Sequence, residues 1–423
     1  MQKPFEWDSF SDQPLQLRDR NFKKTMRKAQ LFSLIKTLFT ALVVLPISLF
    51  MMPFVRRKDI DSSHFFALGV DHERYPHETL QMVQELGVST LVVRHKIWEM
   101  ESLAELKSFL LACENKKIIL KILQDRENIE NLELFKSNLR RIFTELQGLV
   151  HIYEIGSTIN RAKWGFFSVD EYNRFFQTAY ELRNAEFSHA KLIGSGVIDF
   201  EYHFSAHTLF NLFQYRYDGV SSLLYVDRRG APENIQMGFN LSDKIALLST
   251  MVWLSPKSRH RLYITETNWP ISNTAPYAPT SEYECVSEER YADYMLRYYL
   301  LAFASQQVNV CSWHQLIAPG YGLVDSREGL RKREAFSTYK YMLQTLKNAQ
   351  FLRMDIKRGY HIFQALLAND TLLQIHWSLK PATIRNESDY EVFDKNGNPI
   401  QAKELHIGDS PLYIYIKSKH EHS

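Results

Sequence analysis

The sequence contains only three cysteines, Cys113, Cys285 and Cys311. An odd number of widely spaced cysteines excludes the disulfide framework that stabilises many small secreted domains. Cys311 lies in an apolar run, which predicts a buried side chain. The sequence also lacks a CxxC pair and any histidine-rich spacing typical of metal ligands. We therefore expect no bound metal and no cofactor.

The sequence has no GxGxxG segment, no internal repeat and no low-complexity stretch. Its net charge of +3 is unevenly distributed, because residues 1–60 hold 11 Lys and Arg against 5 Asp and Glu. The remaining residues hold 40 basic and 43 acidic side chains. Beyond the N-terminus no basic patch alternates with aromatic residues, so we do not expect the protein to bind nucleic acid.

Residues 37–54 form a stretch of 18 residues without a charge. This length is near the minimum for a membrane-spanning helix, and the long side chain of Lys36 can reach the interface. More basic residues precede the stretch than follow it. The positive-inside rule then predicts a cytoplasmic basic tail over residues 1–30 and a transmembrane signal anchor over residues 31–55.

This topology places residues 60–423 on the periplasmic or extracellular side of the inner or plasma membrane. A buried helix of a soluble protein is one alternative. A cleaved signal peptide is another, but no small-x-small cleavage site follows the apolar stretch. We therefore expect a single-pass membrane protein with its N-terminus in the cytoplasm.

From residue 65 on, eight short runs rich in β-branched and aromatic residues alternate with stretches of helical periodicity. Eight such alternations predict an α/β fold, a (β/α)8 barrel, over residues 60–350. A doubly wound sheet is the alternative, but it usually has fewer strands and a glycine-rich first turn. The expected strands are Phe65–Asp71, Thr90–Ile97, Ile118–Asp125, Val150–Ser157, Lys191–Asp199, Gly219–Asp227, Arg261–Thr267 and Asn309–Ile317.

The pattern changes after a last helix near residues 339–347. Residues 351–423 contain short alternating runs and a strong turn signal, DKNGNP at Asp394–Pro399. They predict a small all-β appendage that resembles a β-sandwich. Its expected strands are Gly359–Leu367, Leu372–Ser378, Tyr390–Phe393 and Leu412–Ile416.

Two of the expected barrel strands end in polar clusters, which is where barrel enzymes carry their catalytic groups. YITETNWP at Tyr263–Pro270 places the carboxylate of Glu266 at a strand end. Sugar cleavage with retention needs two carboxyl groups about 5 Å apart, one as nucleophile and one as acid/base. Glu266 is the candidate nucleophile, and a carboxylate that caps a loop is the alternative. YEIGSTIN at Tyr153–Asn160 ends without a second carboxylate.

In their order and strand placement, these motifs resemble the retaining glycoside hydrolases on (β/α)8 barrels, and among them the β-xylosidase-like and α-L-iduronidase-like family. Members read roughly EIGNEPN…W at the fourth strand and ITEtnW at the seventh. The resemblance covers about residues 65–420. It implies that Glu266 is the nucleophile, with Arg94 and Tyr225 beside it, and that the acid/base carboxylate is replaced by Thr158.

The resemblance also implies a set of sugar-binding residues. Trp313 matches an aromatic residue that floors the sugar site, and we expect Trp313 and Trp269 to stack on sugar faces. His314 follows Trp313 and could bind sugar hydroxyls or be a core histidine. The fourth-strand motif adds Ser157, Asn160 and Trp164.

These patterns predict a membrane-anchored, glycoside hydrolase-like protein that acts on a cell-envelope or secreted polysaccharide. Threonine cannot donate a proton near neutral pH, and general acid catalysis contributes about 10²- to 10⁴-fold. Three options follow: a substitute carboxylate, a leaving group that needs no proton, or an inactive barrel that binds glycan in polysaccharide assembly or export. The substitutes considered are Asp199, Glu201 and Asp227.

Overall fold

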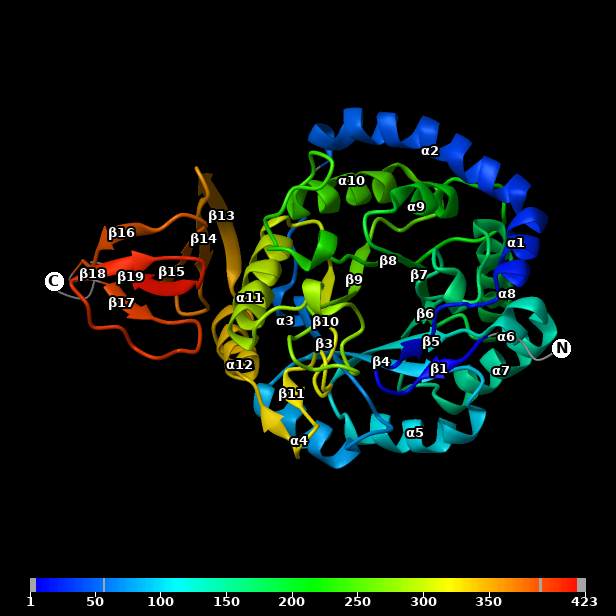
Figure 1. Cartoon of the computed structure of the whole chain (residues 1–423), viewed down its shortest axis with the longest axis horizontal. Coiled ribbons are helices and arrows are strands. Elements are labelled where there is room, and N and C mark those ends of the chain that lie inside the picture. The colour runs from blue at the N-terminus through cyan, green and yellow to red at the C-terminus, as the bar shows by residue number, and fades with distance from the viewer. Residues whose placement is uncertain (1–4, 56–57, 388–389, 417–423) are drawn as a thin grey trace.

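The computed structural model describes residues 5–55, 58–387 and 390–416 (Figure 1). Its centre is a closed barrel of eight strands in the order β10-β3-β4-β5-β6-β7-β8-β9, paired in parallel throughout. Each strand falls on one of the eight expected segments, so the predicted (β/α)8 barrel is confirmed. The strands are β3 (Phe66–Val70), β4 (Thr90–Lys96), β5 (Lys117–Leu123), β6 (Ile152–Ile155), β7 (Lys191–Ile198), β8 (Gly219–Leu223), β9 (Leu262–Thr267) and β10 (Val310–Trp313).

Several helices around the barrel begin at a side-chain cap. Ser168 accepts a hydrogen bond from the Glu171 amide at the start of α8 (Val169–Glu186), and Asn240 and Asp243 form a capping box on α10 (Leu241–Leu254). The other helices of this ring are α3 (Ser62–Phe65), α4 (Pro76–Leu86), α5 (Leu103–Ala112), α6 (Arg126–Glu130), α7 (Leu132–Glu145), α9 (Tyr202–Leu209), α11 (Glu288–Ala304) and α12 (Glu334–Leu346).

The barrel interior is apolar at one level and charged at the next. The apolar level comprises Ala67, Val92, Ile119, Ile152, Ile193, Tyr263 and Val310. On β8, Gly219 leaves room for the ring of Tyr263, which a Cβ at this position would meet. Because side chains alternate along a strand, the residues two positions further along also point inward. On β4, β5 and β6 these are Arg94, Lys121 and Glu154, so the C-terminal end of the interior carries charge.

The C-terminal region is all-β, as expected. A five-stranded antiparallel sheet has the order β13-β14-β15-β19-β17, and β16 pairs with β18 in a separate two-stranded sheet. One face of the larger sheet joins the main core through Phe363, Ile375 and Trp377. The sequence did not predict β13, β16 and β18: β13 is largely exposed, and β16 and β18 are only four residues long. The strands are β13 (Gln350–Lys357), β14 (Tyr360–Leu366), β15 (Leu372–Ser378), β16 (Ala382–Arg385), β17 (Tyr390–Phe393), β18 (Glu404–Ile407) and β19 (Leu412–Ile416).

The N-terminal residues form a hairpin and two helices on the outside of the barrel. The hairpin consists of β1 (Trp7–Asp8) and β2 (Gln13–Pro14). It is followed by α1 (Arg20–Ala29) and α2 (Leu31–Met51). In Figure 1, α2 runs across the outside of α9 and α10.

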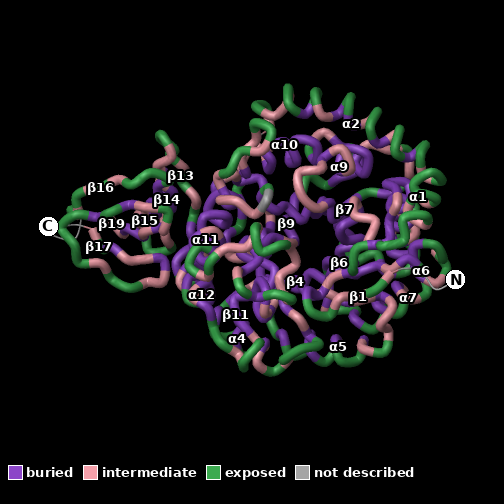
Figure 2. Tube along the Cα trace, in the orientation of Figure 1, coloured by how far each residue is buried: buried purple, intermediate pink, exposed green. Residues whose placement is uncertain are grey.

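The apolar helix expected near residues 31–55 is present. With the 3-10 turn that follows it, it covers Leu31–Phe54 and has a mean hydropathy of 2.1. Its length and composition suit a membrane anchor or a signal sequence. Figure 2 shows most of its surface exposed.

Candidate functional site

A cleft of about 190 Å³ opens at the C-terminal end of the barrel, around Glu266. The C-terminal ends of β4, β7 and β9 and the loops after β6, β8, β9 and β10 line it, as expected for the site of a barrel enzyme. The cleft brings together six of the predicted site residues: Glu266, Arg94, Thr158, Tyr225, Trp164 and His314. Four others do not line it: Ser157, Asn160, Trp269 and Trp313.

Both oxygens of Glu266 have a partner. The Tyr225 hydroxyl donates to Oε1 at 2.6 Å, and the Lys121 ammonium donates to Oε2 at 3.0 Å. Burial on its own raises the pKa of Glu266, but the charges of Lys121 and Arg94 and the Tyr225 hydrogen bond outweigh it. The pKa of Glu266 is therefore held well below its ordinary value, and the carboxylate is ionised at neutral pH.

Lys121 also lies close to a second carboxylate that does not reach the cleft. Its Nζ is 3.8 Å from Oε2 of Glu154, whose Oε1 accepts a hydrogen bond from Thr265 at 3.0 Å. Burial raises the pKa of Glu154, although Lys121 counters part of the rise. The sequence prediction missed both residues. The signal was a charge in the interior of an apolar strand, Lys121 in KIILKIL and Glu154 in IYEI.

The wall opposite Glu266 is a tight corner after β6. Thr158 sits there with a φ of 53°, a left-handed conformation that is unfavourable for a β-branched residue. Gln124 fixes the corner, because it accepts a hydrogen bond from the Ser157 amide at 3.0 Å and donates to the Ser157 carbonyl at 2.8 Å. It also donates to the Trp164 carbonyl at 3.0 Å. Ser157 therefore shapes the corner from behind instead of facing the cleft.

The three substitute carboxylates considered from the sequence do not line the cleft. Arg161 binds two of them, Asp199 and Glu201, each at 2.7 Å. The third, Asp227, is exposed in the loop after β8. Asn160 donates to Glu201 at 2.8 Å and accepts from the Ile198 amide at 3.0 Å, so it ties two loops together. Within the described residues, the carboxylates that line the cleft are Glu266 and Asp12.

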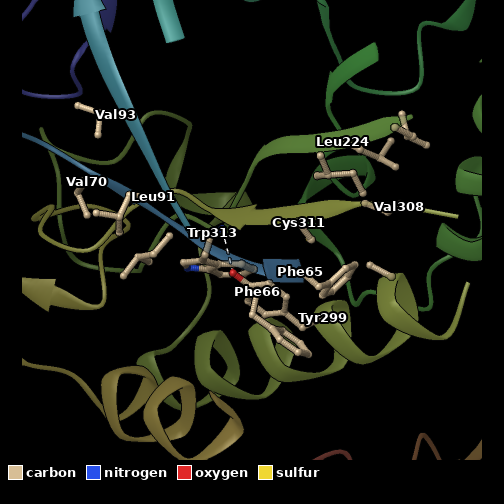
Figure 3. Packing of buried hydrophobic residues seen from close by; sticks show 14 of the residues in the cluster. Phe65, Phe66, Val70, Leu91, Val93, Leu224, Tyr299, Val308, Cys311 and Trp313 are labelled. Carbon is tan, nitrogen blue, oxygen red and sulfur yellow. Dashed lines mark hydrogen bonds between the residues drawn. The ribbon is translucent and has the colours of Figure 1, made fainter. Parts of the chain in front are cut away.

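Trp313 and Trp269 require a correction, because neither has a face available to a sugar. Both are 0% exposed, and their rings stack on each other with centroids 5.7 Å apart. The Trp313 indole nitrogen donates to the Tyr291 hydroxyl at 2.6 Å. Figure 3 shows Trp313 packed among Phe65, Phe66 and Tyr299. The two tryptophans are core residues that support the end of the barrel.

The N-terminal hairpin occupies part of the cleft. The carboxylate of Asp12 forms an ion pair with Arg94. Lys163 donates to Oε1 of Gln13 at 2.7 Å, and the side-chain amide of Gln13 donates to the Pro279 carbonyl at 3.3 Å. The sequence prediction placed residues 1–30 away from the barrel and gave no signal for this contact.

The hairpin also covers Trp164, the one predicted sugar-binding tryptophan that lines the cleft. The Trp7 ring packs edge-on against Trp164, with centroids 5.9 Å apart, and against Trp98, at 5.7 Å. These three rings border a neighbouring cavity of about 370 Å³. Of the predicted aromatic contacts, Trp164 is thus the one at the surface of the site, and the chain's own indole lies against it.

The remaining lining of the cleft is rich in positive charge. Arg94, Arg161, Lys163 and Arg229 line it, and the Arg229 guanidinium lies 3.7 Å from the centre of the Tyr225 ring. Burial lowers the pKa of Lys163 to about 8. Burial also lowers the pKa of His314 to about 3, so this imidazole is neutral at physiological pH.

No protein-family model and no curated protein matches the sequence. Solved structures do match. A family 39 glycoside hydrolase from the gut symbiont Bacteroides cellulosilyticus is 14% identical over 85% of this chain and 82% of its own, with a TM-score of 0.66. A family 39 β-xylosidase from Caulobacter crescentus is 12% identical over 86% and 98%, with a TM-score of 0.57.

A family 30 endoxylanase from Clostridium papyrosolvens is 7% identical over 86% of this chain and 97% of its own, with a TM-score of 0.56. The chain has the fold of family 39 and family 30 glycoside hydrolases. This likeness confirms the fold that the sequence motifs implied. At these identities the family 39 fold carries no assignment of activity, which has to be argued from the residues of the cleft.

Proposed function

We propose that the cleft above Glu266 binds a glycan and that the protein does not hydrolyse ordinary O-glycosides. The observation that carries this proposal is the wall around Thr158. Its cleft-lining residues are Thr158, Arg161, Lys163, Trp164 and Ile198, none of which is a carboxylic acid. A leaving group on this side would find no carboxylic acid to protonate it, and the ammonium of Lys163, whose pKa burial lowers to about 8, donates to Gln13.

The surroundings of Glu266 support the same conclusion. A nucleophilic carboxylate must share its charge with an anomeric carbon that becomes positive in the transition state. Here one oxygen already binds the ammonium of Lys121 at 3.0 Å. A fixed positive charge at this place stabilises the ionised carboxylate in the ground state and opposes an oxocarbenium-like transition state.

The ligand we propose is an oligo- or polysaccharide of the cell envelope or a secreted polysaccharide, bound during assembly or export. Two of the proteins that share the fold are named as an endoxylanase and a β-xylosidase. We propose sugar-binding roles for Trp164 and His314, which line the cleft. We further propose that α2 attaches the barrel to a membrane, where the charge asymmetry of the sequence favours a single pass with residues 1–30 in the cytoplasm.

Hydrolysis is the second candidate, and the orientation of Glu266 favours it. Tyr225 holds Oε1 at 2.6 Å, and Arg94 adds positive charge nearby, as the resemblance implied for a nucleophile. In this case Glu266 would attack activated glycosides, whose departure needs no acid.

Activated 2-fluoroglycosides with a dinitrophenyl leaving group distinguish the two candidates. The binding proposal expects glycan retention on an array and no covalent mass increase on the intact protein. An adduct on Glu266 that is absent from Glu266→Gln would show that Glu266 is a nucleophile and would support the second candidate. A folded protein that retains no glycan and forms no adduct would contradict both.

A further inference from the structure

The distribution of residues on α2 is the reverse of that on a surface helix of a soluble protein, which packs its apolar side against the core. The side that faces the barrel carries small or polar residues, and the side that faces outward carries large apolar ones. The buried residues are Ser33, Thr37, Ala41, Val44 and Ser48. The exposed residues are Leu31, Phe32, Leu34, Ile35, Leu38, Phe39, Leu42, Val43, Ile47, Leu49 and Phe50.

Polar contacts hold the inner side of α2 to the barrel. Thr37 hydrogen-bonds His207 at 2.8 Å, the Asp170 amide donates to the Ser33 hydroxyl at 3.2 Å, and Lys36 pairs with Asp170 at 3.0 Å. Lys36 is the one charged residue of α2, and it lies at the edge of the contact. The outer apolar face therefore carries no charge. Exposure of such a face to water is unfavourable, whereas contact with lipid acyl chains would stabilise it.

The contacts of the hairpin fix the side on which the N-terminus lies. Asp12 pairs with Arg94, and Trp7 packs against Trp164, both at the mouth of the barrel. A spanning α2 would separate these partners by a hydrocarbon layer about 30 Å thick. The contacts and a spanning helix therefore exclude each other in one state of the molecule.

The helix before α2 has the charge that suits an anionic surface. α1 carries five basic residues and no acidic one, and within the described residues none of the five forms an ion pair. They border a groove of about 690 Å³ whose other wall includes Leu31, Leu34 and Phe204. The basic residues are Arg20, Lys23, Lys24, Arg27 and Lys28.

We infer that α2 lies in the plane of an anionic phospholipid surface, with its outer face among the acyl chains and α1 against the headgroups. The barrel and residues 5–17 then lie on the same side of the membrane, and the barrel is held flat against the lipid. This inference rests on the proposed membrane attachment and replaces its single-pass geometry.

Depth measurements along α2 test the geometry directly. Single cysteines at positions 34, 38, 42 and 49, in a Cys285→Ser background, carry a fluorophore in the full-length protein on phosphatidylcholine–phosphatidylglycerol vesicles. Quenching by doxyl lipids should report one common shallow depth for all four. A depth that passes through the bilayer centre would overturn the inference and leave the attachment standing.

Sidedness gives an independent readout. One cysteine replaces Phe10 in the N-terminal segment, and another replaces Tyr283 on the rim of the barrel. Both should react with an impermeant maleimide from the same side of the membrane. Labelling from opposite sides would overturn the inference. A protein that does not bind the vesicles would overturn the inference and the attachment together. A dimer in which the cysteines on α2 do not react with the maleimide would do the same.

The role of α1 has a matched control. A variant without most of the positive charge of α1 should partition onto anionic vesicles about 10²-fold or more weakly. In this variant Gln replaces Lys23, Lys24, Arg27 and Lys28. Changing Arg353, Lys357, Arg358 and Lys380 to Gln, which removes the same charge from the C-terminal region, should leave partition within about threefold. Equal losses in both variants would contradict the assignment of α1 to the headgroups.

Discussion

The Lys121 ammonium lies between two carboxylates, 3.0 Å from Oε2 of Glu266 and 3.8 Å from Oε2 of Glu154. A single buried cation thus stabilises the cleft carboxylate more than the deeper one, and the pKa values of the two carboxyl groups move apart. The same contact supports the proposal that Glu266 does not act as a nucleophile. Lys121 therefore bears on the proposed lack of hydrolysis as much as Thr158 does.

The first prediction concerns acid stability. The folded-state pKa of Glu266 lies below its unfolded value of about 4.3, so its contribution to the free energy of unfolding is present above that pH and is lost as the pH falls further. Glu266→Gln should cost about 3 kcal/mol at pH 7, because it breaks a buried pair, and clearly less at pH 3. Urea unfolding at both pH values measures the difference. Glu181→Gln, an exposed control, should show no such pH dependence.

The second prediction concerns the strained corner. Thr158 has a φ of 53°, where glycine pays no penalty and a β-branched residue costs about 1–2 kcal/mol. Thr158→Gly should therefore raise the free energy of unfolding by about 1 kcal/mol. Thr178→Gly, inside α8, should instead lower it by about 0.3 kcal/mol, the difference between the helix propensities of the two residues. A destabilised Thr158→Gly would show that the threonine side chain contributes more than its backbone costs.

The third prediction separates core from binding surface. Trp313→Ala should lower the free energy of unfolding by about 3–5 kcal/mol, because it empties a fully enclosed site. Trp253→Ala removes an indole that is 43% exposed on α10 and should cost about 1 kcal/mol. Thermal unfolding compares them. A stable Trp313→Ala with weakened glycan binding would restore the role that the sequence had predicted.

The fourth prediction concerns the hairpin in the cleft. Asp12→Asn removes the negative charge that pairs with Arg94. Because the hairpin then competes less well for Arg94, glycan affinity should rise about tenfold, which is a gain of about 1.4 kcal/mol in binding free energy. Asp19→Asn keeps the cap of α1, changes the same charge and should leave affinity unchanged. Titration calorimetry with an array-selected glycan distinguishes the two. Equal affinities would show that the glycan does not compete with Asp12.

Local periodicity was enough to predict the barrel, because each strand and helix carries its own pattern of buried residues. Glu266, Arg94 and Tyr225 could be placed because each stands at or near the end of a strand that the pattern defines. Lys121 and Glu154 were within reach, since a charge in a buried apolar strand must have a partner.

Two features lay beyond the sequence. The burial of Trp313 and Trp269 depends on how α11 and the loop after β8 pack over them, which no local pattern encodes. The contact between Asp12 and Arg94 joins residues 82 positions apart, and the hairpin that makes it has no apolar periodicity of its own. Charge asymmetry around α2 favours a single pass, and the in-plane position that we infer for α2 takes its place because it keeps this contact.

The hairpin is covalently attached to the barrel whose cleft it fills, so it acts as a tethered competitor. Its local concentration is set by the connection through α1 and α2 and does not change when the protein is diluted. A glycan bound in the cleft would have to outcompete this concentration, and its apparent dissociation constant would rise as the inverse of the fraction of molecules whose cleft is open. A fragment that begins after α2 would therefore bind more tightly than the full chain, with every residue of the cleft unchanged.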